Sequence, residues 1–165
     1  MSFPDDLHGL WAPWRVEYFS LEKTRDFLTE AAQTNDDAAH LVVARGKNTF
    51  LLMNRFPYAV GHLMAVPYRK AADLADLTAE EQLELWGLAM LAQKILRRVA
   101  NAQGFNIGLN IGKCAGAGVA DHLHLHIVPR WEGDQNFMPV LADTRVMPDA
   151  LRTMYEKLVA ARAEI

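Results

Sequence analysis

An alternation of histidine and apolar residues constrains the fold of this chain more than any other feature. The segment DHLHLHIVPRW, residues 121–131, places His122, His124 and His126 at every second position, each followed by leucine or isoleucine. Successive side chains of a β-strand point to opposite faces of the sheet. The pattern therefore predicts a strand with one apolar face on the core and three imidazoles on the other face.

The segment before this strand shows the same division. In FNIGLNIG, residues 105–112, apolar residues alternate with Asn106, Gly108 and Asn110. We expect the two segments to pair as a hairpin, so that their asparagine and histidine faces form one polar surface. Gly108 would leave room there for a ligand close to the backbone. The glycine-rich segment KCAGAGVA connects the two strands.

The remaining patterns predict an α+β fold. Thr78 and Glu81 form a T-x-x-E capping box before a segment of helical periodicity, so we expect a long helix from Thr78 to near Gly104. A second helix is expected from Pro148 onward. Three more strands are expected at residues 40–45, 49–54 and 62–67. Hairpins with separate helices favour an antiparallel sheet.

The N-terminal part lacks such patterns. We expect residues 1–39 to be an irregular arm and loop, and residues 40–165 to be a single domain. The aromatic residues of LWAPWRVEYF, residues 10–19, are expected to cover a core or a subunit interface, because large aromatic side chains mostly supply buried area.

Composition and charge exclude several classes of protein. The chain has 165 residues and a net charge of −3, and so lacks the basic surplus typical of nucleic-acid-binding domains. Its single cysteine, Cys114, excludes an intrachain disulfide and favours a reducing compartment. We recognise neither a signal peptide nor an apolar run of about 20 residues. A cytoplasmic protein without nucleic-acid or membrane partners is expected.

Three interpretations of the histidine row are open. A solvent-exposed row without a role does not account for the strict alternation beside a glycine-rich segment. A zinc site needs ligand nitrogens about 2 Å from the ion, whereas the first and third histidines of one strand lie roughly 13 Å apart. Only two of the three would therefore ligate, with help from elsewhere in the chain.

The third interpretation is attack on phosphorus by a neutral imidazole. One ring nitrogen attacks while the other keeps its proton on an acceptor, commonly a backbone carbonyl. A neighbouring histidine can protonate the leaving oxygen, because its ordinary pKa lies near working pH. Backbone N–H groups of the glycine-rich segment can bind the phosphate oxygens. All these groups are present in this stretch of sequence.

The motif HLHLHIV resembles the H-φ-H-φ-H-φ-φ signature (φ apolar) of the histidine-triad superfamily. The similarity extends to LWAPWR, NRFPYAVGHLMAVPYR, GFNIGLNIGKCAGAGVADHLHLHIVPRW and GDQNFMPV. These segments are typical of the branch that contains dinucleoside-polyphosphate phosphorylases and hydrolases. The resemblance implies an α+β fold, a homodimer, and transfer of a nucleoside monophosphate through a histidine.

The resemblance also implies roles for the histidines. His124 would be the nucleophile, His126 would contact the bridging or leaving phosphate, and His122 would orient the site through its carbonyl or its side chain. His62 would support these residues.

For the substrate, the resemblance implies that Asn54 meets the ribose. Phosphate oxygens would be bound by Asn110, Ala117 and Gly118. We also expect apolar residues such as Phe50 and Leu52 to stack on the base.

One departure concerns metal. Many bacterial relatives bind a structural zinc through a CxxC pair, a histidine after VPYR and the first histidine of the triad. Here LTEAAQTNDDAA contains no cysteine, and Lys70 follows VPYR. We therefore predict no zinc and no other cofactor in the protein, with Mg²⁺ arriving only with a polyphosphate substrate.

The sequence thus predicts nucleotidyl transfer or hydrolysis of dinucleoside polyphosphates, such as diadenosine tetraphosphate, through a histidine-nucleotidyl intermediate. Phosphate and water both remain possible acceptors. Two alternatives are a nucleotide-binding or sensor protein without turnover, and a zinc-dependent hydrolase.

Overall fold

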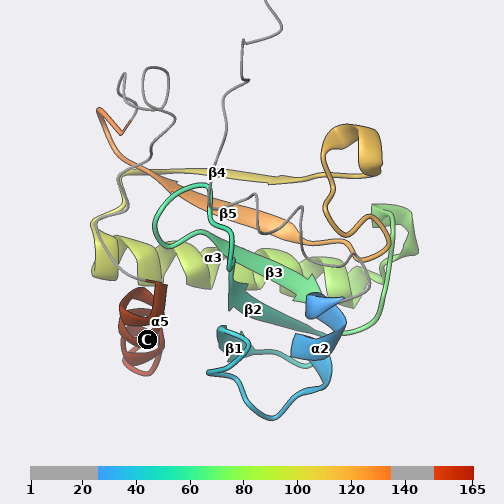
Figure 1. Cartoon of the computed structure of the whole chain (residues 1–165), viewed down its shortest axis with the longest axis horizontal. Coiled ribbons are helices and arrows are strands. Elements are labelled where there is room, and N and C mark those ends of the chain that lie inside the picture. The colour runs from blue at the N-terminus through green and yellow to red at the C-terminus, as the bar shows by residue number, and fades with distance from the viewer. Residues whose placement is uncertain (1–25, 135–150) are drawn as a thin grey trace, which may run out of the picture.

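The computed structural model describes residues 26–134 and 151–165, and its centre is a five-stranded antiparallel sheet. The strand order is β1-β2-β3-β5-β4 (Figure 1). The strands are β1 Val42–Arg45, β2 Thr49–Met53, β3 Leu63–Pro67, β4 Gly104–Leu109 and β5 Leu125–Arg130. The α+β class and the antiparallel sheet expected from the sequence are confirmed.

The expected hairpin of β4 and β5 is present, with Gly108 opposite His126. The histidine strand is shorter than predicted, because β5 begins only at Leu125. The reason lies in the neighbouring loop, since the N–H of Leu123 donates to the carbonyl of Ala71 instead of joining a strand ladder. His122 and His124 therefore lie on the segment that leads into β5.

One face of the sheet carries the main core. Helix α3, Ala79–Ala100, and helix α5, Leu151–Arg162, pack on it together with the apolar side chains of Leu123, Leu125 and Ile127. The capping box of Thr78 and Glu81 is formed as predicted. Helix α3 ends before the predicted Gly104, because Asn101 takes the left-handed conformation at its C-cap.

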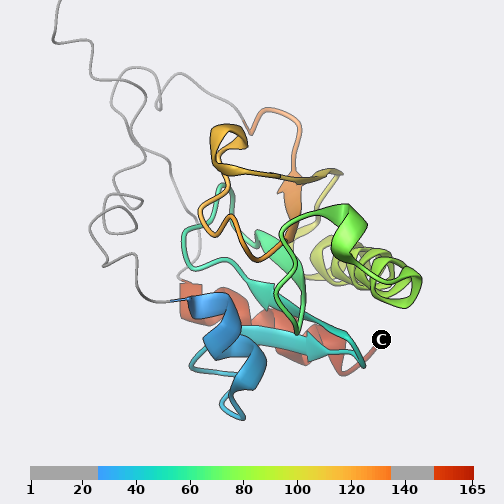
Figure 2. The same cartoon turned by 90° about the vertical axis from the view of Figure 1, so that its right-hand side faces the viewer.

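A short helix, α2, Phe27–Gln33, covers the other face, so the expectation of an irregular segment throughout residues 1–39 is wrong for this part. Asp26 caps α2 by accepting from the N–H of Thr29. Leu28 and Ala31 then pack with apolar residues of β1, β2 and β3 in a second core. Figure 2 shows α2 and α3 on opposite sides of the sheet.

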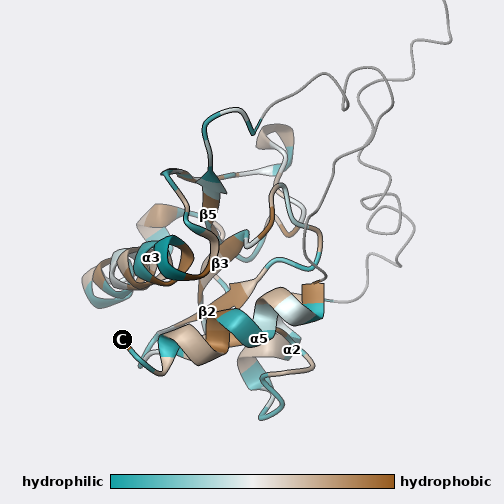
Figure 3. Cartoon of the chain, turned by 90° about the vertical axis from the view of Figure 1, so that its left-hand side faces the viewer, coloured by the Kyte–Doolittle hydropathy of each residue, from teal (hydrophilic) through white to brown (hydrophobic). Residues whose placement is uncertain are grey.

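Short 3₁₀ turns, η2 Leu74–Asp76 and η3 Lys113–Ala115, lie in the loops after β3 and β4. In Figure 3 strands β2 and β3 are brown, whereas helices α3 and α5 carry both colours, as expected for elements with one buried face.

No helix in residues 26–134 or 151–165 combines the length and hydropathy of a membrane span. The aromatic arm at residues 10–19, most of GDQNFMPV and the predicted helix start at Pro148 lie outside the described residues.

Candidate active site

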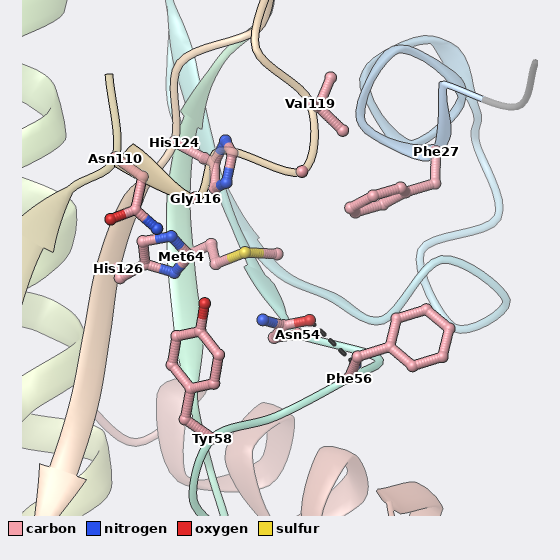
Figure 4. Close-up of a pocket in the computed structure, with 11 residues that line it drawn as sticks. Phe27, Asn54, Phe56, Tyr58, Met64, Asn110, Gly116, Val119, His124 and His126 are labelled. Carbon is pink, nitrogen blue, oxygen red and sulfur yellow. Dashed lines mark hydrogen bonds between the residues drawn. The ribbon is translucent and has the colours of Figure 1, made fainter. Parts of the chain in front are cut away.

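A pocket opens on the α2 side of the sheet, beside β5 (Figure 4). It is partly open to solvent, and about 410 Å³ of empty space, open solvent included, lies between its walls. Its walls come from α2, the β2–β3 loop, β3, the end of β4, the glycine-rich segment and the histidine segment. The lining residues are Phe27, Asn54, Phe56, Tyr58, Met64, Asn110, Gly116, Gly118, Val119, His124 and His126.

His124 is buried, and its ring is held by the backbone. Its Nδ1 lies 2.8 Å from the carbonyl oxygen of His122. A carbonyl only accepts, so Nδ1 carries the proton and, in the neutral ring, Nε2 keeps a lone pair. Burial lowers the pKa of His124 below its ordinary value, an effect that outweighs the hydrogen bond to His122. The ring is thus held as a neutral base at the pocket.

His122 is fully buried and does not line the pocket. Its Nε2 lies 2.8 Å from the carbonyl oxygen of Pro67 at the end of β3. This hydrogen bond fixes the backbone whose carbonyl holds His124. Both the carbonyl and the side chain of His122 thus lie on the chain of hydrogen bonds that ends at His124, and its expected role in orienting the site stays a prediction. The interpretation of the row as exposed histidines is wrong, since all three rings are buried.

His126 is held by His62. The Nε2 of His62 and the Nδ1 of His126 lie 3.0 Å apart. The N–H of Tyr58 donates to Nδ1 of His62 at 3.2 Å, so in neutral His62 the proton is on Nε2. His62 then donates to Nδ1 of His126, which leaves the proton of His126 on Nε2. His126 is therefore prepared as a hydrogen-bond donor, whereas His124 is prepared as a nucleophile.

Asn54 completes this chain of hydrogen bonds. Its Oδ1 accepts from the N–H of Phe56 at 2.9 Å, which orients the amide (Figure 4). Its Nδ2 consequently points to Nδ1 of His62, at 3.3 Å. Asn54 thus lines the pocket and supports the tautomer of His62, while its expected contact with a ribose stays a prediction.

The apolar wall of the pocket differs from the one predicted. Phe50 and Leu52 are buried in the second core and do not line the pocket. Phe27, Phe56, Met64 and Val119 take this place, with both phenylalanine rings across the pocket from the histidines in Figure 4. The wall depends on α2, which lies in the segment expected to be irregular.

The glycine-rich segment closes the pocket at the end of β4. Asn110, Gly116 and Gly118 line it, whereas Ala117 does not. Gly112 and Gly116 have φ angles of 80° and 86°, a region that favours glycine. These two residues turn the chain back toward the histidine segment. Cys114 is exposed and lies outside the pocket lining.

Three charged side chains meet near His122. By the resemblance, this is the region in which many bacterial relatives bind a structural zinc. Lys70 Nζ is 2.6 Å from Asp26 Oδ2 and 2.9 Å from Asp121 Oδ2, and Asp26 Oδ1 is 4.0 Å from His122 Nδ1. An ammonium group is not a metal ligand, and it takes the position between the two carboxylates. Within the described ranges, no group of three His, Cys, Asp or Glu side chains is placed to hold a metal. These residues do not fit zinc.

A family model described as the HIT domain matches residues 35–133. The chain belongs to the HIT family. A HIT relative from Mycobacterium tuberculosis (strain H37Rv), described as AP-4-A phosphorylase, is 42% identical over 159 residues, which are 90% of this chain and 80% of the relative. The histidine row is accordingly the HIT motif.

Solved HIT structures share the fold. A Zn-bound histidine triad family protein from Mycobacterium smegmatis has 28% identity and a TM-score of 0.62 over 75% of this chain and 84% of its own. Diadenosine triphosphate hydrolase from Plasmodium falciparum, in complex with Cyclomarin A, has 26% identity and a TM-score of 0.58 over 76% of each chain.

The sequence predicts most of the polar residues of the pocket but not several residues of its walls. The missed pocket residues are Phe27, Phe56, Tyr58, Met64, Gly116 and Val119. For Phe27 a local signal exists, since Asp26 and the spacing of Leu28 and Ala31 are typical of a short capped helix. For Met64 the signal was strand alternation, because it faces the same side as His126, its partner across β3 and β5.

Proposed function

We propose that this HIT protein transfers a nucleoside monophosphate from a dinucleoside polyphosphate through a covalent intermediate on His124. The observation that carries the proposal is the 2.8 Å hydrogen bond from Nδ1 of His124 to the carbonyl of His122, which leaves Nε2 as the nucleophile at the pocket. A nearby donor, His126, lies with its ring centroid 4.8 Å from that of His124.

The reaction has two displacements. In the first, Nε2 of His124 bonds to phosphorus, and the bond from phosphorus to the bridging oxygen breaks with its electron pair on that oxygen. The Nε2–H of His126 donates to this oxygen and stabilises its developing charge. In the second, an acceptor oxygen bonds to phosphorus, and the phosphorus–nitrogen bond breaks to regenerate neutral His124.

The walls of the pocket are consistent with a nucleotide. Phe27, Phe56, Met64 and Val119 supply an apolar surface for the base, while Asn54 is available to the ribose. Asn110 and the backbone around Gly116 and Gly118 are available to phosphate oxygens. The relative named AP-4-A phosphorylase supports diadenosine tetraphosphate as substrate and orthophosphate as acceptor.

Product analysis tests the proposal. Purified protein is incubated with diadenosine tetraphosphate, with and without orthophosphate. Phosphorolysis gives ADP and ATP, whereas hydrolysis gives AMP and ATP. We expect ADP only when phosphate is added, and no product from His124→Ala. Nucleotide binding without any product would contradict the proposal and identify a binding protein.

We also propose a homodimer. Strand β4 is an edge of the sheet and pairs on its outer side with no strand of the described chain. Phe105, Ile107 and Leu109 of β4 are only partly buried. Helix α3 exposes Leu83, Trp86 and Met90, with exposed fractions of 76%, 54% and 59%. A second copy would cover these apolar side chains and the open strand edge.

The remaining proposals concern cofactor and location. We infer that the protein needs no resident metal, since Lys70 occupies the place between Asp26 and Asp121, and that Mg²⁺ enters only with the polyphosphate. The cytoplasm is supported by the single cysteine, which is free and exposed. Nucleic acid and membranes are not proposed as partners.

A further inference from the structure

Tyr58 contacts both His62 and His126, the ring proposed above to donate to the leaving oxygen. Its ring stacks on His62, with centroids 4.8 Å apart and planes inclined by 26°. It also lies against His126, at 5.7 Å and 37°. Figure 4 shows its hydroxyl pointing into the pocket toward His126 and Met64. No role for Tyr58 follows from the two displacements described above.

The backbone N–H and the ring of Tyr58 both act on the pair of rings of His62 and His126. The backbone N–H fixes the proton of His62 on Nε2, by donating to Nδ1. The His62 and His126 rings are tilted by 43°, with centroids 5.1 Å apart. The hydrogen bond between them fixes one atom of the His126 ring, Nδ1, and does not by itself set the plane of that ring. The ring of Tyr58 packs on both imidazoles and so restricts this plane.

His124 is held differently. It depends on the carbonyl of His122, and His122 in turn on the carbonyl of Pro67. Neither hydrogen bond involves the β2–β3 loop that carries Tyr58. A change at Tyr58 therefore acts on the orientation of His126 before it acts on the nucleophile.

We propose that Tyr58 is a positioning residue for leaving-group departure: its ring holds His126 so that Nε2–H faces the bond that breaks. This inference rests on the function proposed above. The step it assists is breakage of the bond between phosphorus and the leaving oxygen. That oxygen takes the electron pair and accepts a hydrogen bond from His126, while Nε2 of His124 forms the new bond to phosphorus.

Two esters of AMP test the proposal. The p-nitrophenyl ester releases a stabilised anion and needs little help, whereas the phenyl ester releases a more basic anion that depends on His126. The quantity compared is kcat/KM, which contains only the steps up to release of the phenol. For Tyr58→Leu we expect kcat/KM of the phenyl ester to fall roughly tenfold more than that of the p-nitrophenyl ester.

Two further variants complete the test. Tyr58→Phe keeps the ring and should restore the wild-type ratio of the two kcat/KM values. His126→Ala should shift that ratio in the same direction as Tyr58→Leu. An equal loss on both esters in a folded Tyr58→Leu protein, checked by its melting temperature, would overturn the proposal. So would a Tyr58→Phe ratio like that of Tyr58→Leu, because the hydroxyl would then be the acting group.

Failure of the proposed function itself would look different. His124→Ala would then still turn over both esters, or the wild-type protein would turn over neither of them.

Discussion

His124 and His126 hold their protons on opposite ring nitrogens, although their ring centroids are only 4.8 Å apart. The carbonyl of His122 keeps the proton of His124 on Nδ1. His62 keeps the proton of His126 on Nε2, because it donates to Nδ1 of that ring. Two identical side chains thus acquire different chemistry from their partners. One can attack phosphorus, and the other can stabilise the oxygen that leaves.

The first prediction concerns pH. Burial lowers the pKa of His124 below its ordinary value of 6.5. A base with a lowered pKa stays neutral when the pH falls below 6.5, so the nucleophile remains active there. The acid limb of kcat/KM for diadenosine tetraphosphate should therefore lie below pH 6.5. A limb above this value, in a protein that is still folded, would contradict the neutral and buried state of His124.

The second prediction concerns His62. His62→Phe keeps the ring volume but removes the donor to Nδ1 of His126. Turnover of diadenosine tetraphosphate should fall by about 100-fold, the scale of losing one oriented hydrogen-bond donor in an active site. Asn54→Ala should lower turnover less through its effect on the tautomer of His62, because the N–H of Tyr58 still donates to His62. Turnover of His62→Phe within twofold of wild type would rule out the proposed tautomer chain.

The third prediction concerns the ionic cluster at α2. Burial by itself would raise the pKa of Asp26, but hydrogen bonds from Lys70 and Thr29 outweigh it and lower the pKa from 3.8 to about 2. A lowered carboxylate pKa stabilises the fold above pH 3.8, and this contribution is lost as the pH falls toward 2.

Asp26→Asn isolates this effect, because asparagine is also a good N-cap. We expect the free energy of unfolding at pH 7 to fall by about 1 kcal/mol, a value reduced for the partial exposure of the pair. Urea unfolding at pH 7 and pH 3 measures it. The difference between variant and wild type should be smaller at pH 3. An equal difference at both pH values would show that the charge of Asp26 contributes nothing.

The fourth prediction concerns assembly. Glutamate at position 86 or 90 would place a charge in the proposed interface, so Trp86→Glu and Met90→Glu should shift the protein to monomers. Light scattering after size exclusion measures the mass. Val159→Glu is the matched control, since Val159 is also exposed but belongs to α5 and to neither α3 nor β4. A wild-type protein that is monomeric at high concentration would contradict the proposed dimer.

The sequence predicts the polar half of the site better than the apolar half, for a physical reason. Asn110, His124 and His126 line the pocket and belong to two segments of strict two-residue alternation, and extended chain converts that period into a shared face even at the strand ends, where Asn110 and His124 lie. Phe27 reaches the pocket only because α2 packs on the sheet. This packing depends on side chains distant in sequence, such as Lys70, which pairs with Asp26 at the start of α2. A seven-residue helix depends on such packing more than on its own propensity.

The sequence predicts a nucleophilic imidazole with its second nitrogen on a backbone carbonyl, but the tautomers of His62 and His126 were beyond it for a related reason. They depend on which nitrogen meets which neighbour, and that is set by the path of the β2–β3 loop. The N–H of Tyr58 reaches His62 because of the path of residues 54–62, along which the N–H of Phe56 also donates to Asn54. Alternation predicts that His124 and His126 share a face. It does not predict that one is a nucleophile and the other a donor.

The most direct test is to trap the covalent intermediate. Protein is mixed with diadenosine tetraphosphate without orthophosphate, quenched in base, in which a phosphorus–nitrogen bond survives, and analysed by peptide mass spectrometry. We predict one nucleoside monophosphate on His124, absent in His124→Ala and discharged as ADP when phosphate is added before the quench. A nucleotide on another residue, or steady product release from His124→Ala, would contradict the assignment of His124 as the nucleophile.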